Sequence, residues 1–78
     1  MYINADDIKR SILLSSHEEW KRQCDCLGRI AAISMNSYSK VLGYVDAAAA
    51  DLPDIEWAQD RCRQARDAVV NGWLDRDD

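Results

Sequence analysis

The sequence predicts an all-α protein built from three helices, and three observations lead to this fold class. Apolar residues recur at every third or fourth position through most of the chain, which is the period of a helix with one buried face. The alternation of apolar and polar residues that is typical of strands is absent. Hydrophobic residues make up 47% of the 78 residues, which is enough for a folded core. Residues 1–78 are therefore expected to form a single small helical domain.

The first helix is short and is expected over residues 5–14. Asn4 is placed to cap it, and Asp6 and Asp7 lie in its first turn, where the helix dipole favours acidic side chains. The serines at positions 15 and 16 end this helix and begin the next one.

The central helix is expected to be one long spine over residues 16–51. At about 100° per residue, its apolar side chains keep a single direction. That stripe consists of Trp20, Cys24, Leu27, Ala31, Met35, Tyr38, Leu42, Val45 and Ala49. Ser16 and Glu19 have the spacing of a capping box, and Pro53 disfavours helix at the residue before it. Gly28 and Gly43 each cost about 1 kcal/mol relative to Ala inside a helix, which is too little to interrupt the pattern.

The third helix is expected over residues 53–74, with a frayed acidic tail over residues 75–78. A short connection places it antiparallel to the C-terminal half of the spine, which leaves the N-terminal half to the first helix. Eight residues are predicted to be largely buried: Leu27, Tyr38, Leu42, Val45, Ile55, Cys62, Val69 and Trp73.

The charge is acidic overall, with a net value of −4, and it is unevenly placed. Residues 21–45 carry four bases and one acid, whereas residues 46–78 carry nine acids and four arginines. Pairing between a basic spine and an acidic third helix is the favoured explanation. Steering of a charged partner is the alternative.

No residue pattern predicts a catalytic, metal or cofactor site, so the chain is not expected to be an enzyme. Cys24 and Cys26 would point about 200° apart on a helix, and Cys62 lies on a core face, so the spacing is poor for zinc. His17 is the only histidine and lies at a helix start. Three cysteines without a signal peptide indicate a reducing cytoplasm, and no apolar run is long enough for a membrane span.

The favoured function is therefore a small acidic module that binds another protein, as an accessory regulator or inhibitor. Trp57 lies about 130° from the core stripe of its own helix, and Arg61 and Gln64 follow it by one and two turns. Exposed Trp and Arg are the residue types favoured at binding hot spots. A second row, about 120° from the main stripe of the spine, is predicted to form an interface, of which a symmetric homodimer is the commonest form. Its members named as partner-binding residues are Cys26, Ile33 and Tyr44, and Ser37 lies in the same row. The alternative is that the first and third helices cover both rows and leave a monomer.

The alternative function is a DNA-binding regulator that uses residues 30–42. This stretch resembles a helix-turn-helix motif in which Asn36 takes the turn and residues 37–40 begin the recognition helix. The continuous apolar stripe and the acidic total charge favour the protein-binding interpretation, because contacts to phosphates need a basic surface. Nucleic acid is accordingly not the expected partner.

Overall fold

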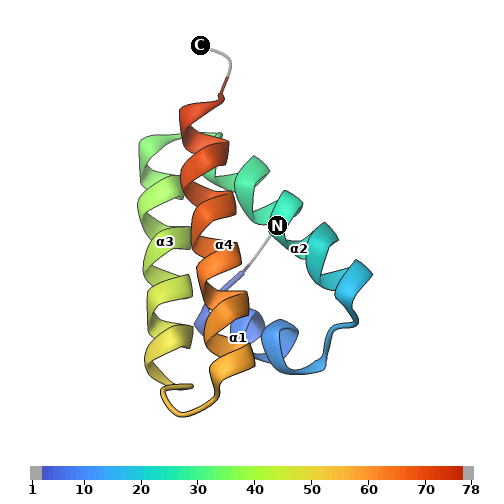
Figure 1. Ribbon diagram of the computed structural model, residues 1–78. Coiled ribbons are helices and arrows are strands. Elements are labelled where there is room, and N and C mark those ends of the chain that lie inside the picture. Colours follow the sequence, from blue (N-terminus) through green and yellow to red (C-terminus); the bar gives the residue numbers. More distant parts are fainter. Residues whose placement is uncertain (1–2, 77–78) are drawn as a thin grey trace.

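The computed structural model describes residues 3–76 and folds them into four helices. These are α1 (Ala5–Leu14), α2 (His17–Ala31), α3 (Met35–Ala50) and α4 (Glu56–Leu74). The all-α class is confirmed, whereas the predicted count of three helices is wrong. Figure 1 shows α3 and α4 side by side and antiparallel, with α2 crossing obliquely beside α4 and α1 near the lower ends of α3 and α4.

The predicted spine over residues 16–51 is interrupted at Ala32, Ile33 and Ser34, between α2 and α3. Ser34 is extended, with φ −163° and ψ 163°, and its hydroxyl accepts a hydrogen bond of 3.1 Å from the backbone N–H of Ser37. A serine that caps a new helix in this way offers the backbone an alternative to continued helix. The break lets α2 and α3 both pack against α4 at different angles.

The change of direction at the break also moves the buried face of α3. Its buried residues are Val41, Val45 and Ala48, and of these only Val45 belongs to the predicted stripe. Leu42 is only half-buried, and Met35 is 56% exposed at the start of the helix. Because the residues that follow Val41 and Ala48 are also apolar, the helical pattern in the sequence runs through the break without interruption. The pattern therefore gave no sign of the turn.

The core is only partly the one predicted. Leu27, Val45, Cys62 and Val69 are buried as expected. The other four predicted core residues are half-buried: Tyr38, Leu42, Ile55 and Trp73. Tyr38 and Trp73 stack on each other between α3 and α4, with ring centroids 5.5 Å apart. Aromatic rings in so thin a bundle cover the core while keeping one edge in water.

Helices α2 and α4 approach most closely at two glycines. A Cβ added to Gly28 would lie 2.9 Å from the carbonyl oxygen of Ala68, and a Cβ added to Gly72 would overlap the backbone of Gly28. Glycine at these positions therefore permits the crossing. Gly72 does not end the helix, because α4 continues to Leu74, where its end was expected.

The starts and neighbours of the outer helices differ partly from expectation. The predicted bounds of α1, its Asn4 cap and the capping box of Ser16 and Glu19 are all present. Helix α4 begins at Glu56 rather than at residue 53, and the side chain of Gln59 bridges the gap by donating to the carbonyl oxygen of Ala49 at 2.9 Å and to that of Leu52.

Helix α1 packs mainly on α3 instead of on the N-terminal half of the predicted spine. The ion pair between α3 and α4 joins Asp46 to Arg66, which is the reverse of the predicted pairing between a basic spine and an acidic third helix. In the predicted tail over residues 75–78, Asp75 lies in a turn, and positions 77 and 78 lie outside the described residues.

Candidate protein-interaction site

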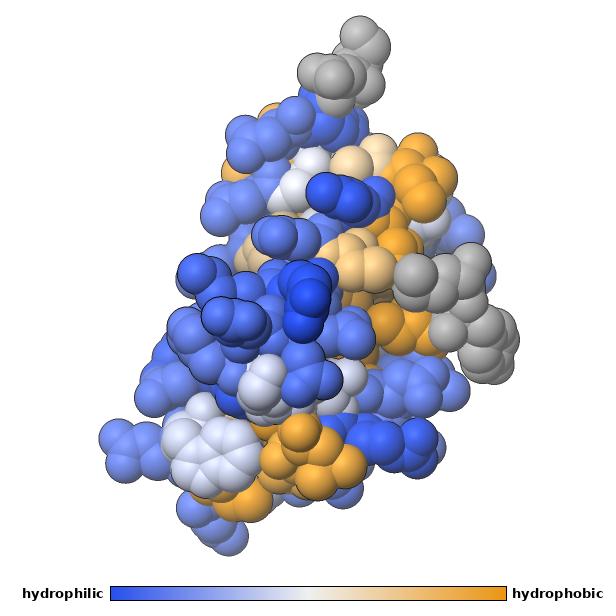
Figure 2. Space-filling model, turned by 90° about the vertical axis from the view of Figure 1, so that its right-hand side faces the viewer, coloured by the Kyte–Doolittle hydropathy of each residue, from blue (hydrophilic) through white to orange (hydrophobic). Residues whose placement is uncertain are grey.

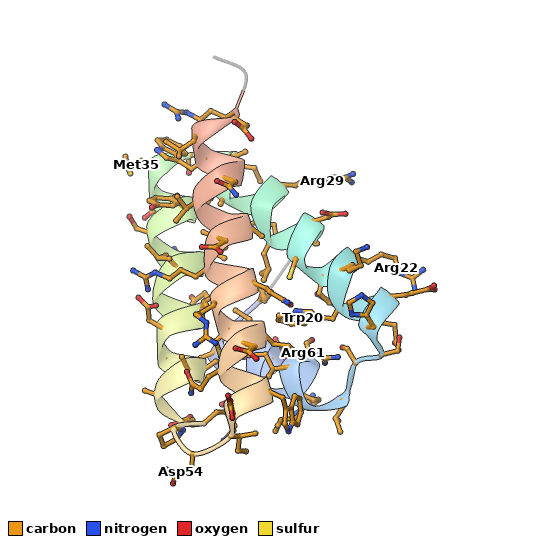
Figure 3. All side chains as sticks on the ribbon, viewed as in Figure 1. Trp20, Arg22, Arg29, Met35, Asp54 and Arg61 are labelled. Carbon is orange, nitrogen blue, oxygen red and sulfur yellow. The ribbon has the colours of Figure 1, made fainter. Side chains whose placement is uncertain are left out.

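Arg61 on α4 holds the end of α1 against the rest of the molecule. Its Nη1 donates hydrogen bonds of 2.8 Å to the carbonyl oxygens of Ile12 and Ser15. Carbonyl groups in the last turn of a helix have no partner within the helix, so a guanidinium there satisfies them and complements the helix dipole. Figure 3 places Arg61 beside Trp20, in the space between α2, α4 and α1.

Two tryptophan rings lie close to the same guanidinium. The Cζ of Arg61 lies 5.6 Å from the ring centroid of Trp20 and 5.7 Å from that of Trp57. The Trp20 ring is buried, and its Nε1 donates a hydrogen bond of 2.9 Å to Oε1 of Gln64. Cation–π contacts with two rings and two hydrogen bonds therefore fix the position of Arg61.

Trp57 forms the outer face of this arrangement and is 51% exposed. Leu13 and Leu14 belong to the chain segment that Arg61 holds, and Leu14 is 77% exposed. We call Trp57, Leu13 and Leu14 the Trp57 platform. The face seen in Figure 2 is mostly hydrophilic, and hydrophobic residues gather at its lower end and along one edge. An exposed Trp seated on a fixed arginine is a pre-organised apolar surface.

Trp57, Arg61 and Gln64 were predicted to bind a partner together, and the structure gives the last two contacts inside the molecule. Arg61 and Gln64 both hold Trp20, and only Trp57 turns an apolar side chain to solvent. Leu13 and Leu14 were not singled out from the sequence. The signal was available, because three consecutive apolar residues from Ile12 to Leu14 cannot all face one core from a single helix.

The second predicted row does not exist as a row. Cys26 is half-buried on α2, Ile33 lies in the turn with 74% of its surface exposed, and Tyr44 packs against the core from α3. Their alignment required an uninterrupted helix, and the break at Ala32–Ser34 removes it. Of the three, Ile33 alone is largely exposed to solvent.

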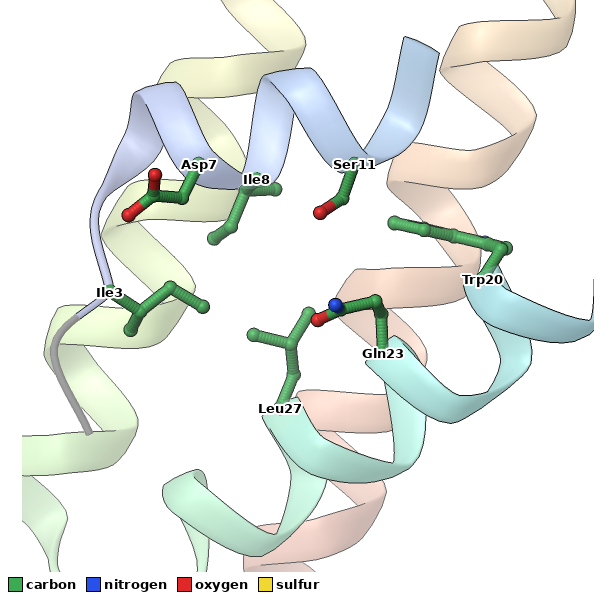
Figure 4. A pocket seen from close by; sticks show the side chains of 7 residues that line it. All are labelled: Ile3, Asp7, Ile8, Ser11, Trp20, Gln23 and Leu27. Atoms are coloured by element: carbon green, nitrogen blue, oxygen red, sulfur yellow. The ribbon is translucent and has the colours of Figure 1, made fainter. Parts of the chain in front are cut away.

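A hollow of about 320 Å³ lies between α1 and α2. Figure 4 shows Asp7, Ile8 and Ser11 entering it from α1, opposite Gln23 and Leu27 from α2. The apolar members Ile8 and Leu27 are themselves almost fully buried, so the hollow has a closed apolar floor and a polar rim. It can accommodate a small side chain or ligand fragment, and its lining contains no nucleophile paired with a base.

The cysteine thiols of the described core are not activated. Burial raises the pKa of Cys24 from 9.0 to about 11, Asp25 adds to the effect, and Arg61 opposes it. Burial also raises the pKa of Cys62. Both thiols are therefore protonated at neutral pH. A protonated thiol is a poor nucleophile, because the reactive species is the thiolate. Within residues 3–76, no three His, Cys, Asp or Glu side chains are placed to hold a metal ion.

The α2–turn–α3 unit has the three-residue turn of a helix-turn-helix, but at residues 32–34 instead of at Asn36. Of the residues expected to begin a recognition helix, Tyr38 stacks on Trp73, while Ser39 and Lys40 are exposed. Lys40 is the only base in α3, and the unit over residues 17–50 carries four bases and four acids. Its surface therefore has no excess of positive charge.

Comparison with family models, with curated proteins and with solved structures gives no match to this chain. Across the described helices, none has the length and apolar character needed to cross a membrane. The functional inference consequently depends on the geometry of the surface.

Proposed function

We propose that this chain is a non-enzymatic protein-interaction module that binds a partner protein through the Trp57 platform. The expected role is that of an accessory regulator or inhibitor, which acts by occupying a surface of its partner. We place the module in the cytoplasm, because thiols at positions 24 and 62 that form no disulfide suit a reducing compartment.

The observation that supports this proposal is a large aromatic side chain held half-exposed on a rigid base. Ordering a flexible side chain on binding costs about 0.5–1.5 kcal/mol, and a Trp already fixed by its neighbours avoids much of that cost. Trp57 rests on Arg61, which two hydrogen bonds and the buried Trp20 hold in place. Energy at interfaces is concentrated in such aromatic anchors, and neighbouring leucines exclude water from them.

A photo-crosslinking experiment tests the location of this surface. A benzophenone amino acid is placed at position 57 and, in a matched control, at the exposed Ala47 on the outer side of α3. In cells of the source organism, the probe at position 57 is expected to give a discrete crosslinked species that is absent with the probe at position 47. Equal labelling from both positions, or none from position 57, would contradict the proposal.

DNA binding is the second candidate because the turn between α2 and α3 has helix-turn-helix length. The balanced charge of residues 17–50 is the reason for ranking it lower. Binding to random duplex DNA at low salt that weakens steeply as salt rises would favour this candidate. Replacement of Lys40 by Glu should then reduce the affinity, because Lys40 is the only base on α3, the recognition helix of this candidate.

A further inference from the structure

A shallow groove of about 560 Å³ lies where α2 and α4 cross, at the opposite end of α4 from Trp57. Three of its lining residues, Gly28, Ala32 and Gly72, have small side chains or none. The close backbone approach of α2 and α4 requires glycine at positions 28 and 72, as described above. The crossing therefore leaves a concave surface that no side chain of the described chain fills.

Two exposed apolar side chains belong to the segments that line this groove. Ile33 directly follows Ala32 and is 74% exposed, and Leu74 lies between Gly72 and Asp75 and is 67% exposed. Ile33 therefore neighbours the groove lining in the chain, and an exposed aliphatic side chain together with a recess can complement itself in a second copy. Isologous interfaces have this property, because each copy contributes both the protrusion and the recess.

The charges around the groove favour a second copy over a strongly charged partner. Asp25, Arg29, Asp75 and Arg76 line it, so the two signs are balanced. Arg76 is placed over the Trp73 ring, with its Cζ 3.6 Å from the centroid. Within residues 3–76, Arg29 and Asp75 have no ion-pair partner. Figure 3 shows Arg29 pointing away from the body of the molecule.

We propose that this surface binds a second copy of the chain about a two-fold axis. Ile33 of each copy enters the groove of the other, and Arg29 of each copy pairs with Asp75 of the other. This inference goes beyond the proposed function and does not involve the Trp57 platform. The dimer presents two platforms, so a partner with two binding sites would be held by both at once.

Sedimentation equilibrium tests the dimer. At protein concentrations up to about 1 mM, where even weak association is populated, the unaltered chain is expected to show twice the monomer mass. Ile33→Glu should give the monomer mass with an unchanged helical circular dichroism spectrum, since Ile33 is exposed in the single chain. A monomer mass for the unaltered chain, or a dimer that survives Ile33→Glu, would overturn the proposal.

A charge exchange tests the orientation of the two copies. Arg29→Asp and Asp75→Arg should each weaken the dimer by about tenfold or more, and the double variant should recover most of that loss. Double-variant dimers as weak as the sum of the single effects would show that Arg29 and Asp75 do not meet.

Leu14→Glu is the control at the other end of the molecule, and it should leave the dimer unchanged. Loss of the dimer in that variant would move self-association to the Trp57 platform and overturn the groove assignment. If the probe at position 57 gave no specific crosslink, the masses measured by sedimentation equilibrium would not change. The two proposals can therefore fail separately.

Discussion

Glycines 28 and 72 are required by the close packing of α2 and α4, whereas Gly43 is not, and substitution by alanine distinguishes the two cases. Gly72→Ala should destabilise the protein by about 1–3 kcal/mol, because the new methyl group overlaps the backbone of Gly28 and forces α2 away from α4. Gly43→Ala should stabilise it by about 1 kcal/mol, because nothing lies within 4 Å of the added Cβ and alanine is the better helix former. Urea denaturation of the two variants measures both effects.

Equal effects of the two substitutions would contradict the close crossing of α2 and α4. Sequence reasoning assigned the same helix-propensity cost to Gly28 and Gly43, because both lie inside a helical pattern. Only the packing of α4 distinguishes a glycine that a neighbour requires from one that faces open space.

Cys24 should make stability sensitive to alkaline pH. Its folded-state pKa is raised from 9.0 to about 11, so the folded protein retains the thiol proton more tightly than the unfolded chain. The resulting contribution to stability is fully present below about pH 9 and is lost as the pH rises toward about 11. The melting temperature of the unaltered protein should therefore approach that of Cys24→Ala across this range. A constant difference between the two proteins would contradict the raised pKa.

Among the elements, α1 is held at its C-terminal end by a side chain from α4. Arg61→Met keeps an unbranched stem but leaves the carbonyl oxygens of Ile12 and Ser15 without their donor. We expect a loss of about 2–3 kcal/mol in the free energy of unfolding. Hydrogen exchange should accelerate first in α1, which has few contacts with α2 and α4.

Arg63→Met is the matched control, because Arg63 lies on the same helix and, among the described residues, pairs only with the exposed Asp60. It should change stability by less than about 1 kcal/mol. If both substitutions had the same small effect, Arg61 would not be the residue that holds α1 in place.

The individual elements were largely predictable, and the break in the spine was not. Local signals sufficed for α1, for the capping box at Ser16 and for the end of α4, since each depends on residues within one or two turns. Ser34 and Ser37 provided the signal for the break, but the apolar phase continued across it. The buried face of α3 is shifted by about one residue from the predicted stripe, and a shift of that size is within the width of an amphipathic stripe.

At the scale of the whole molecule, the sequence predicted the exposure of Trp57 but not what surrounds it. The contacts of Arg61 join residues 46 and 49 positions apart, and Gln64 meets Trp20 across 44 positions. The helical periodicity of α4 by itself cannot predict contacts with residues so far away in the sequence. The row through Cys26, Ile33 and Tyr44 failed for the opposite reason, because it extended a local count across a turn.

Titration calorimetry of the crosslinked partner, once purified, tests the Trp57 platform most directly. Trp57→Ala should weaken binding by at least about 2 kcal/mol, or roughly thirtyfold, as expected for a hot-spot aromatic. Met35→Ala removes a side chain of similar exposure at the other end of the molecule and should change the dissociation constant by less than about twofold. Unchanged affinity for Trp57→Ala in a protein with unchanged helical content would contradict the account.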